Sequence, residues 1–96
     1  MNINEFLQSE IGQYITASLD RGETMQDIIH DLKNPTLDIE EMLATSLQTH
    51  CTPEEIEQYI ESDMLYECTP HGRYLQQCIQ YAIDNSSLIY DTIQSN

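Results

Sequence analysis

Residues 3–19 read INEFLQSEIGQYITASL, and this stretch decides the fold class of the chain. Apolar side chains recur in it at every fourth position: Ile3, Leu7, Ile11, Ile15 and Leu19. Side chains at this spacing share one face of an α-helix, and Phe6 and Tyr14 widen the stripe. The stretch therefore predicts a helix over residues 3–19 with one buried face.

The next segments carry signals for two further helices. Thr24, followed three residues later by Asp27, resembles a capping box that opens a second helix. That helix should end at Asn34, because a residue before proline is disfavoured in the helical region. Asp38 is predicted to cap a third helix, with Leu37 and Met42 as its hydrophobic staple.

The fourth helix start has the clearest local signal in the chain. Thr52 is the predicted cap, Pro53 takes the first helical position and Glu55 completes the capping box. Cys51 and Ile56 form the expected staple pair. The triplet Cys-Thr-Pro recurs at residues 68–70, where it predicts another helix entry, but the residues that follow diverge and indicate no duplication.

Residues 74–93 continue the helical pattern, with a turn-prone Asn-Ser-Ser at 85–87, which predicts one interrupted helix or two. An alternative makes residues 64–67 and 88–93 short strands in an α+β fold. The favoured prediction is a mostly α fold, a small compact domain over residues 1–96 with about five helical segments. Its predicted core is drawn from Leu7, Ile11, Ile15, Ile28, Ile29, Leu43, Ile56, Ile60, Ile79 and Ala82.

Length and charge limit the function classes. The chain has 96 residues and 40% hydrophobic content, enough for one modest core but not for separate substrate and cofactor domains. Seventeen acidic residues against three basic ones give a net charge of −14. Direct binding to nucleic acid or to an anionic membrane is opposed, because Arg21, Lys33 and Arg73 are the only Lys or Arg side chains. The partner should be basic.

The sequence shows no apolar run of the roughly 20 residues that a membrane span needs, and residues 1–5 lack the features of a signal peptide. A cytoplasmic location in a host cell is therefore expected. Three cysteines, an odd number, favour reduced thiols over a disulfide framework.

The histidines and cysteines are the candidates for metal binding and for catalysis. His50 and Cys51, together with Cys68 and His71, offer two imidazoles and two thiols for zinc, but the adjacent pair at 50–51 has poor ligand spacing. We therefore expect no metal and no other cofactor. No nucleophile with a neighbouring base can be read from the sequence around His30, His50 or His71, and the three glycines form no phosphate-binding loop, so catalysis is not expected.

The carboxylates are the more informative feature. Glu23, Asp27 and Asp31 are predicted to form one row along a helix, with steps of about 6 Å. Glu54, Glu57 and Glu61 form a second predicted row. Like charges at this spacing destabilise an isolated helix, and they either solubilise the domain or imitate the phosphates of a nucleic acid.

Residues 75–90, LQQCIQYAIDNSSLIY, resemble a helix of the Ocr-type antirestriction proteins of T7-like phages. The likeness lies in the register of Leu75, Ile79, Ala82, the Asp-Asn pair at 84–85 and Tyr90. It covers about a fifth of the chain, which lacks that family's proline before Tyr90 and its long acidic tail. Size, acidity and helical content are also similar to those of DNA-mimicking anti-CRISPR proteins. Either resemblance implies a stoichiometric inhibitor that occupies the nucleic-acid site of a host defence complex.

The sequence therefore predicts a DNA mimic, encoded by a phage or prophage, that binds a CRISPR surveillance complex or a restriction enzyme through the two carboxylate rows. The alternative is a helical adaptor that docks an apolar groove onto a cellular protein. Its candidate anchors are tyrosines: Tyr66, Tyr74, Tyr81 and Tyr90. Salt should weaken the first kind of interface and leave the second nearly unchanged.

Overall fold

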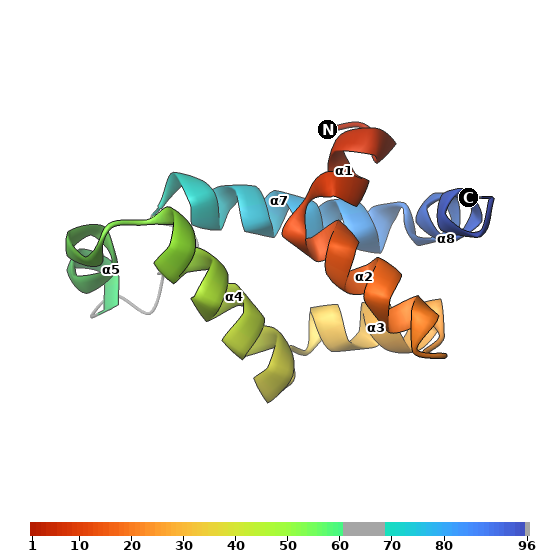
Figure 1. Cartoon of the computed structure of the whole chain (residues 1–96), viewed down its shortest axis with the longest axis horizontal. Coiled ribbons are helices and arrows are strands. Elements are labelled where there is room, and N and C mark those ends of the chain that lie inside the picture. Colours follow the sequence, from red (N-terminus) through yellow and green to blue (C-terminus); the bar gives the residue numbers. More distant parts are fainter. Residues whose placement is uncertain (61–68, 96) are drawn as a thin grey trace.

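The computed structural model describes residues 1–60 and 69–95, and every regular element in these residues is an α-helix (Figure 1). The helices, in chain order, are α1 (Ile3–Gln8), α2 (Glu10–Asp20), α3 (Met25–Lys33), α4 (Leu37–His50), α5 (Pro53–Ile60), α7 (Pro70–Asp84) and α8 (Ser86–Gln94). The predicted mostly α fold is confirmed. The molecule is elongated, with principal extents of 42 × 25 × 20 Å.

Helix α7 organises the packing, because α2, α3, α4 and α8 all contact it (Figure 1). It runs along the long axis of the molecule and buries Leu75, Cys78 and Ala82. The ring of Tyr81 packs on Phe6 from α1, with 5.0 Å between the ring centroids. One core therefore joins the two ends of the sequence through α7.

Most of the predicted core is buried. The buried members are Ile11, Ile15, Ile28, Leu43, Ile79 and Ala82. Leu7, Ile29 and Ile56 are partly buried against that core, and the side chain of Ile60 lies outside the described residues. Burial of this apolar surface is the main stabilising contribution, at about 25 cal/mol per Å² removed from water.

The helix starts follow the capping chemistry of the sequence. Thr24 and Thr69 each accept a hydrogen bond from the backbone N–H three residues ahead. At Thr52 the box is reciprocal, because the Glu55 N–H donates to the Thr52 hydroxyl and the Thr52 N–H donates to the Glu55 carboxylate, both at 3.2 Å. Such caps stabilise a helix by about 1 kcal/mol each.

The single helix predicted over residues 3–19 is wrong, because the chain turns at Ser9 between α1 and α2 (Figure 1). Ser9 has extended backbone angles and its hydroxyl caps α2 by accepting from the Gly12 N–H at 3.0 Å. A methyl group at Gly12 would overlap the Phe6 carbonyl oxygen and lie 2.8 Å from the Leu7 Cα. The break therefore depends on a serine that can cap and a glycine that leaves room for α1.

Two other expectations need correction. The cap of α4 is Thr36, whose hydroxyl accepts from the Ile39 N–H, and Asp38 lies inside the helix. Leu37 is 78% exposed and so forms no buried staple.

Residues 88–93 belong to α8, so the strand alternative is wrong there, while residues 64–67 lie outside the described residues. The predicted interruption falls at Asn85, and two helices result.

Candidate functional site

The predicted acidic row on α3 is shorter than the sequence indicated. Thr24 has extended backbone angles (φ −87°, ψ 152°) and starts the helix at Met25, so Glu23 precedes it. Glu23 instead forms an ion pair with Arg21 at 3.0 Å. Asp27 and Asp31 remain one helical turn apart, Asp27 exposed and Asp31 half-buried.

The second acidic row lies on α5. Glu54 and Glu57 are exposed on this helix, and Glu61 lies outside the described residues. Their neighbour Glu55 is engaged in the capping box with Thr52. The structure therefore places two carboxylates of this row, Glu54 and Glu57, at the surface.

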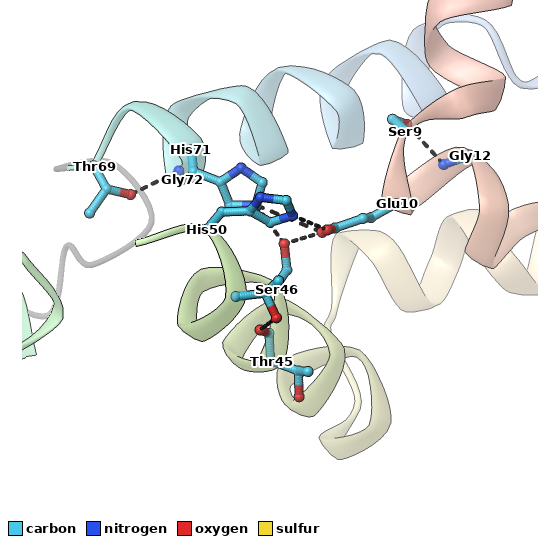
Figure 2. Close-up of polar contacts among 10 residues, drawn as sticks. Ser9, Glu10, Gly12, Thr45, Ser46, His50, Thr69, His71 and Gly72 are labelled. Carbon is cyan, nitrogen blue, oxygen red and sulfur yellow. Dashed lines mark hydrogen bonds and ion pairs between the residues drawn. The ribbon is translucent and has the colours of Figure 1, made fainter. Parts of the chain in front are cut away.

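A polar cluster that the sequence did not reveal lies where α2, α4 and α7 meet (Figure 2). Glu10 begins α2, Ser46 and His50 lie on the last two turns of α4, and His71 lies in the first turn of α7. In Figure 2 the two imidazoles, the carboxylate and the hydroxyl point toward one another. We call these four residues the Glu10 cluster.

Short contacts join the members of the Glu10 cluster. Glu10 accepts a hydrogen bond from the Ser46 hydroxyl, and its other oxygen lies 2.8 Å from His50 Nε2. His71 Nε2 lies 2.5 Å from the Ser46 oxygen and 3.7 Å from the Glu10 carboxylate. The imidazole rings are tilted by 32° to each other, with centroids 4.3 Å apart. Because the serine proton points to Glu10, His71 Nε2 donates to the Ser46 oxygen.

Electrostatics set the charge state of the Glu10 cluster. Partial burial alone would raise the pKa of Glu10, but the hydrogen bonds from Ser46 and His50 and the charges of both histidines outweigh it and lower that pKa. Burial, and then the neighbouring His50, lower the pKa of His71 despite the opposing effect of Glu10. At neutral pH the cluster holds an ionised carboxylate beside a neutral imidazole.

The Glu10 cluster does not have the geometry of a serine nucleophile. In a Ser-His-acid triad the acid and the serine contact different nitrogens of the imidazole. Here the Ser46 hydroxyl and the Glu10 carboxylate both approach Nε2 of His71, and the serine donates to the acid. Ser46 is also only 5% exposed, in the interior of α4. Nucleophilic attack by Ser46 is therefore not supported.

The ligand-type atoms of Glu10, His50 and His71 all lie within 4.8 Å of one another. The sequence indicates His50 and His71 as possible zinc ligands, but in a set with Cys51 and Cys68. Cys51 is a buried free thiol outside this group, and Cys68 lies outside the described residues. Glu10 and Ser46 gave no signal, because they are 36 positions apart in the chain.

Two open grooves lie beside the Glu10 cluster and beside helix α3. A groove of about 460 Å³ between α2 and α4 is lined in part by Glu10 and Ser46 and gives solvent access to the Glu10 cluster. A larger groove of about 760 Å³ lies between α3 and α8, with Met25, Ile29 and Tyr90 among its lining residues. Glu23 and Lys33 lie at this second groove as well.

Cys78 is a buried thiol, and burial raises its pKa and keeps it protonated at neutral pH.

None of the described helices combines the length and the apolar character that a membrane span requires. No protein family, curated protein or solved structure matches this chain.

Proposed function

We propose that this protein binds a basic nucleic-acid-binding protein of a host cell and inhibits it by placing carboxylates where phosphates would bind. The observation that carries the proposal is the number of carboxylates without a basic neighbour. Among residues 1–60 and 69–95, the Arg21–Glu23 pair is the one contact of a carboxylate with Arg or Lys. Asp27, Glu54 and Glu57 are exposed and available to an external cation.

Electrostatic complementarity favours this kind of partner. A surface with a net charge of −14 attracts a basic protein over a range set by the ionic strength, which speeds encounter and selects partners. The resemblance of residues 75–90 to Ocr-type proteins points to a host defence complex, a CRISPR surveillance complex or a restriction enzyme, as the target. Inhibition would then be stoichiometric and would need no cofactor.

The test begins with capture of the partner from the native host, followed by binding measurements with purified components. Changing Glu54, Glu57 and Glu61 together to lysine should lower affinity more than about 100-fold, since like charges across an interface cost several kcal/mol. A second variant, Asp27→Lys with Asp31→Asn, probes α3 and leaves the Arg21–Glu23 pair intact. Duplex DNA should compete with the wild-type protein for the partner.

The matched control is Glu5→Lys, Asp20→Lys and Asp84→Lys, which changes the net charge by the same amount at exposed sites on α1, α2 and α7. It should lose much less affinity than the α5 variant. Circular dichroism must show that all three variants remain helical. If both acidic-row variants bind as the wild type does, or if DNA does not compete, the proposal is wrong.

A second candidate, an adaptor that binds a protein through an apolar surface, is favoured by the groove between α3 and α8. Tyr90, 42% exposed, lines this groove and is a candidate anchor, whereas Tyr81 is half-buried against Phe6. An adaptor interface should be insensitive to salt and sensitive to Tyr90→Ala. Tyr74→Ala, at a tyrosine with similar exposure outside the groove, is the control.

A further inference from the structure

We propose that Glu10, His50 and His71 form a binding site for a divalent transition-metal ion of the zinc type. The three side chains come from α2, α4 and α7 and converge on one point (Figure 2). This inference does not depend on the proposed function, because none of the three belongs to the acidic rows.

The distances fit a small tetrahedral ion. With zinc about 2.0–2.1 Å from nitrogen and oxygen ligands, tetrahedral ligand atoms lie about 3.3 Å apart. His50 Nε2 is 2.8 Å from one Glu10 oxygen, and His71 Nε2 is 3.7 Å from the other. These values lie on either side of the required spacing, and the ligand-type atoms of all three residues lie within 4.8 Å of one another. Side-chain rotation is therefore needed to bring the three donors around one ion.

The donor types select among cations. Two imidazoles and one carboxylate are typical of zinc sites with three protein ligands and an open fourth position. Calcium and magnesium prefer sites made of oxygen atoms, so they should bind this site weakly. His50 is about half exposed and the α2–α4 groove opens on Glu10, which gives an ion and its water ligand a path to the site.

Ser46 would support the metal from outside the ligand set. Its hydroxyl donates to Glu10 and so orients one of the three proposed ligands. In the metal-free protein the Ser46 oxygen accepts the proton of His71 Nε2, and this proton must leave that nitrogen before it can bind an ion. Outer contacts of this kind typically change metal affinity by about 10–100-fold. Metal would replace the histidine–carboxylate contacts with bonds that connect α2, α4 and α7, and it would thereby stabilise the fold.

The experiment titrates zinc chloride into the full-length, reduced, metal-free protein and follows binding by calorimetry and by thermal unfolding. We expect one equivalent to bind and the melting temperature to rise by several degrees. His50→Ala, which removes an exposed ligand at little risk to folding, should weaken binding at least tenfold. Glu10→Gln keeps the side-chain shape and provides a second ligand variant.

The matched control is His30→Ala, which removes the third histidine of the chain from an exposed position on α3. It should bind zinc as the wild type does. Cobalt substitution identifies the ligand type, because cysteine ligands produce a thiolate-to-cobalt charge-transfer band and this site should not. The proposal would be overturned by such a band, by zinc affinity in both His50→Ala and Glu10→Gln equal to that of the wild type, or by an equal loss of affinity in His30→Ala.

Discussion

The apolar core around α2 and α7 and the Glu10 cluster are built in different ways. The core takes buried apolar side chains from both helices, Ile11 and Ile15 from α2 and Cys78 and Ala82 from α7. The Glu10 cluster joins α2, α4 and α7 through two ionisable imidazoles, a hydroxyl and a carboxylate.

The stability of the apolar core and the stability of the Glu10 cluster depend on different conditions. Apolar burial changes little with pH or with dilute metal ions. Hydrogen bonds and charges in the Glu10 cluster depend on the protonation of their groups and, on our proposal, on a bound ion. The apolar core should therefore be constant across conditions, while the Glu10 cluster should respond to them.

The largest expected effect tests the apolar contact. Ile15→Ala should lower the free energy of unfolding by about 2–5 kcal/mol, because it removes a fully buried side chain and leaves a cavity. Leu37→Ala, at a residue 78% exposed, is the control and should change the same free energy by less than about 0.5 kcal/mol. Urea unfolding followed by circular dichroism measures both. Equal losses would show that Ile15 is not part of the main core.

The next effect tests the close approach of α1 and α2. Gly12→Ala should lower the free energy of unfolding by about 1–3 kcal/mol, because the added methyl group overlaps the backbone of Phe6 and Leu7 and cannot be relieved by rotating a side chain. Gly22→Ala is the matched control. Its cost arises only from the positive φ of 94°, with no atom within 4 Å of the added carbon, and should be about 1 kcal/mol.

If Gly12→Ala proved more stable than the wild type, as helix propensity alone would predict, the close approach of α1 to α2 would be wrong. The comparison with Gly22→Ala thus separates steric exclusion from backbone conformation. Thermal unfolding of both variants, with their circular dichroism spectra, measures the difference.

The helix caps could be predicted from the sequence because capping is local. Thr52, Pro53 and Glu55 specify a helix start within four residues, and the structure shows the predicted hydrogen bonds. The break at Ser9 was missed because the apolar period continues through it. A serine three residues before Gly12 was the available signal, since serine is a common helix cap.

The candidate sites were predicted less well, for a physical reason. A row of carboxylates forms on a helix only when the helix includes every member of the row. Glu23 is not part of the row on α3, because the cap at Thr24 starts this helix after it. The Glu10 cluster depends on how three helices pack, which no local pattern encodes. His50 and His71 were recognisable as possible ligands, but their partner Glu10 is 40 positions from His50.

The smallest expected effect tests the pH response of the Glu10 cluster. The pKa of His71 lies below its ordinary value of 6.5 in the folded protein, so the unfolded chain binds more protons than the native state as pH falls below 6.5. The stability that His71 contributes as a neutral group is therefore fully present above pH 6.5 and is lost as pH falls through the native pKa. Glu10, with its pKa lowered from 4.5, acts in the same direction at lower pH.

The measurement compares His71→Gln with the wild type between pH 7.5 and 5, with a chelator present so that no metal contributes. Because acidification also relieves repulsion among the other carboxylates, the difference between the two proteins is the informative quantity. It should shrink as pH falls, since the wild type alone loses the His71 contribution. Ile15→Val, at a fully buried site, should cost about 0.5–1.5 kcal/mol at every pH. A His71→Gln difference that is equally constant would show that the Glu10 cluster is as independent of pH as the apolar core.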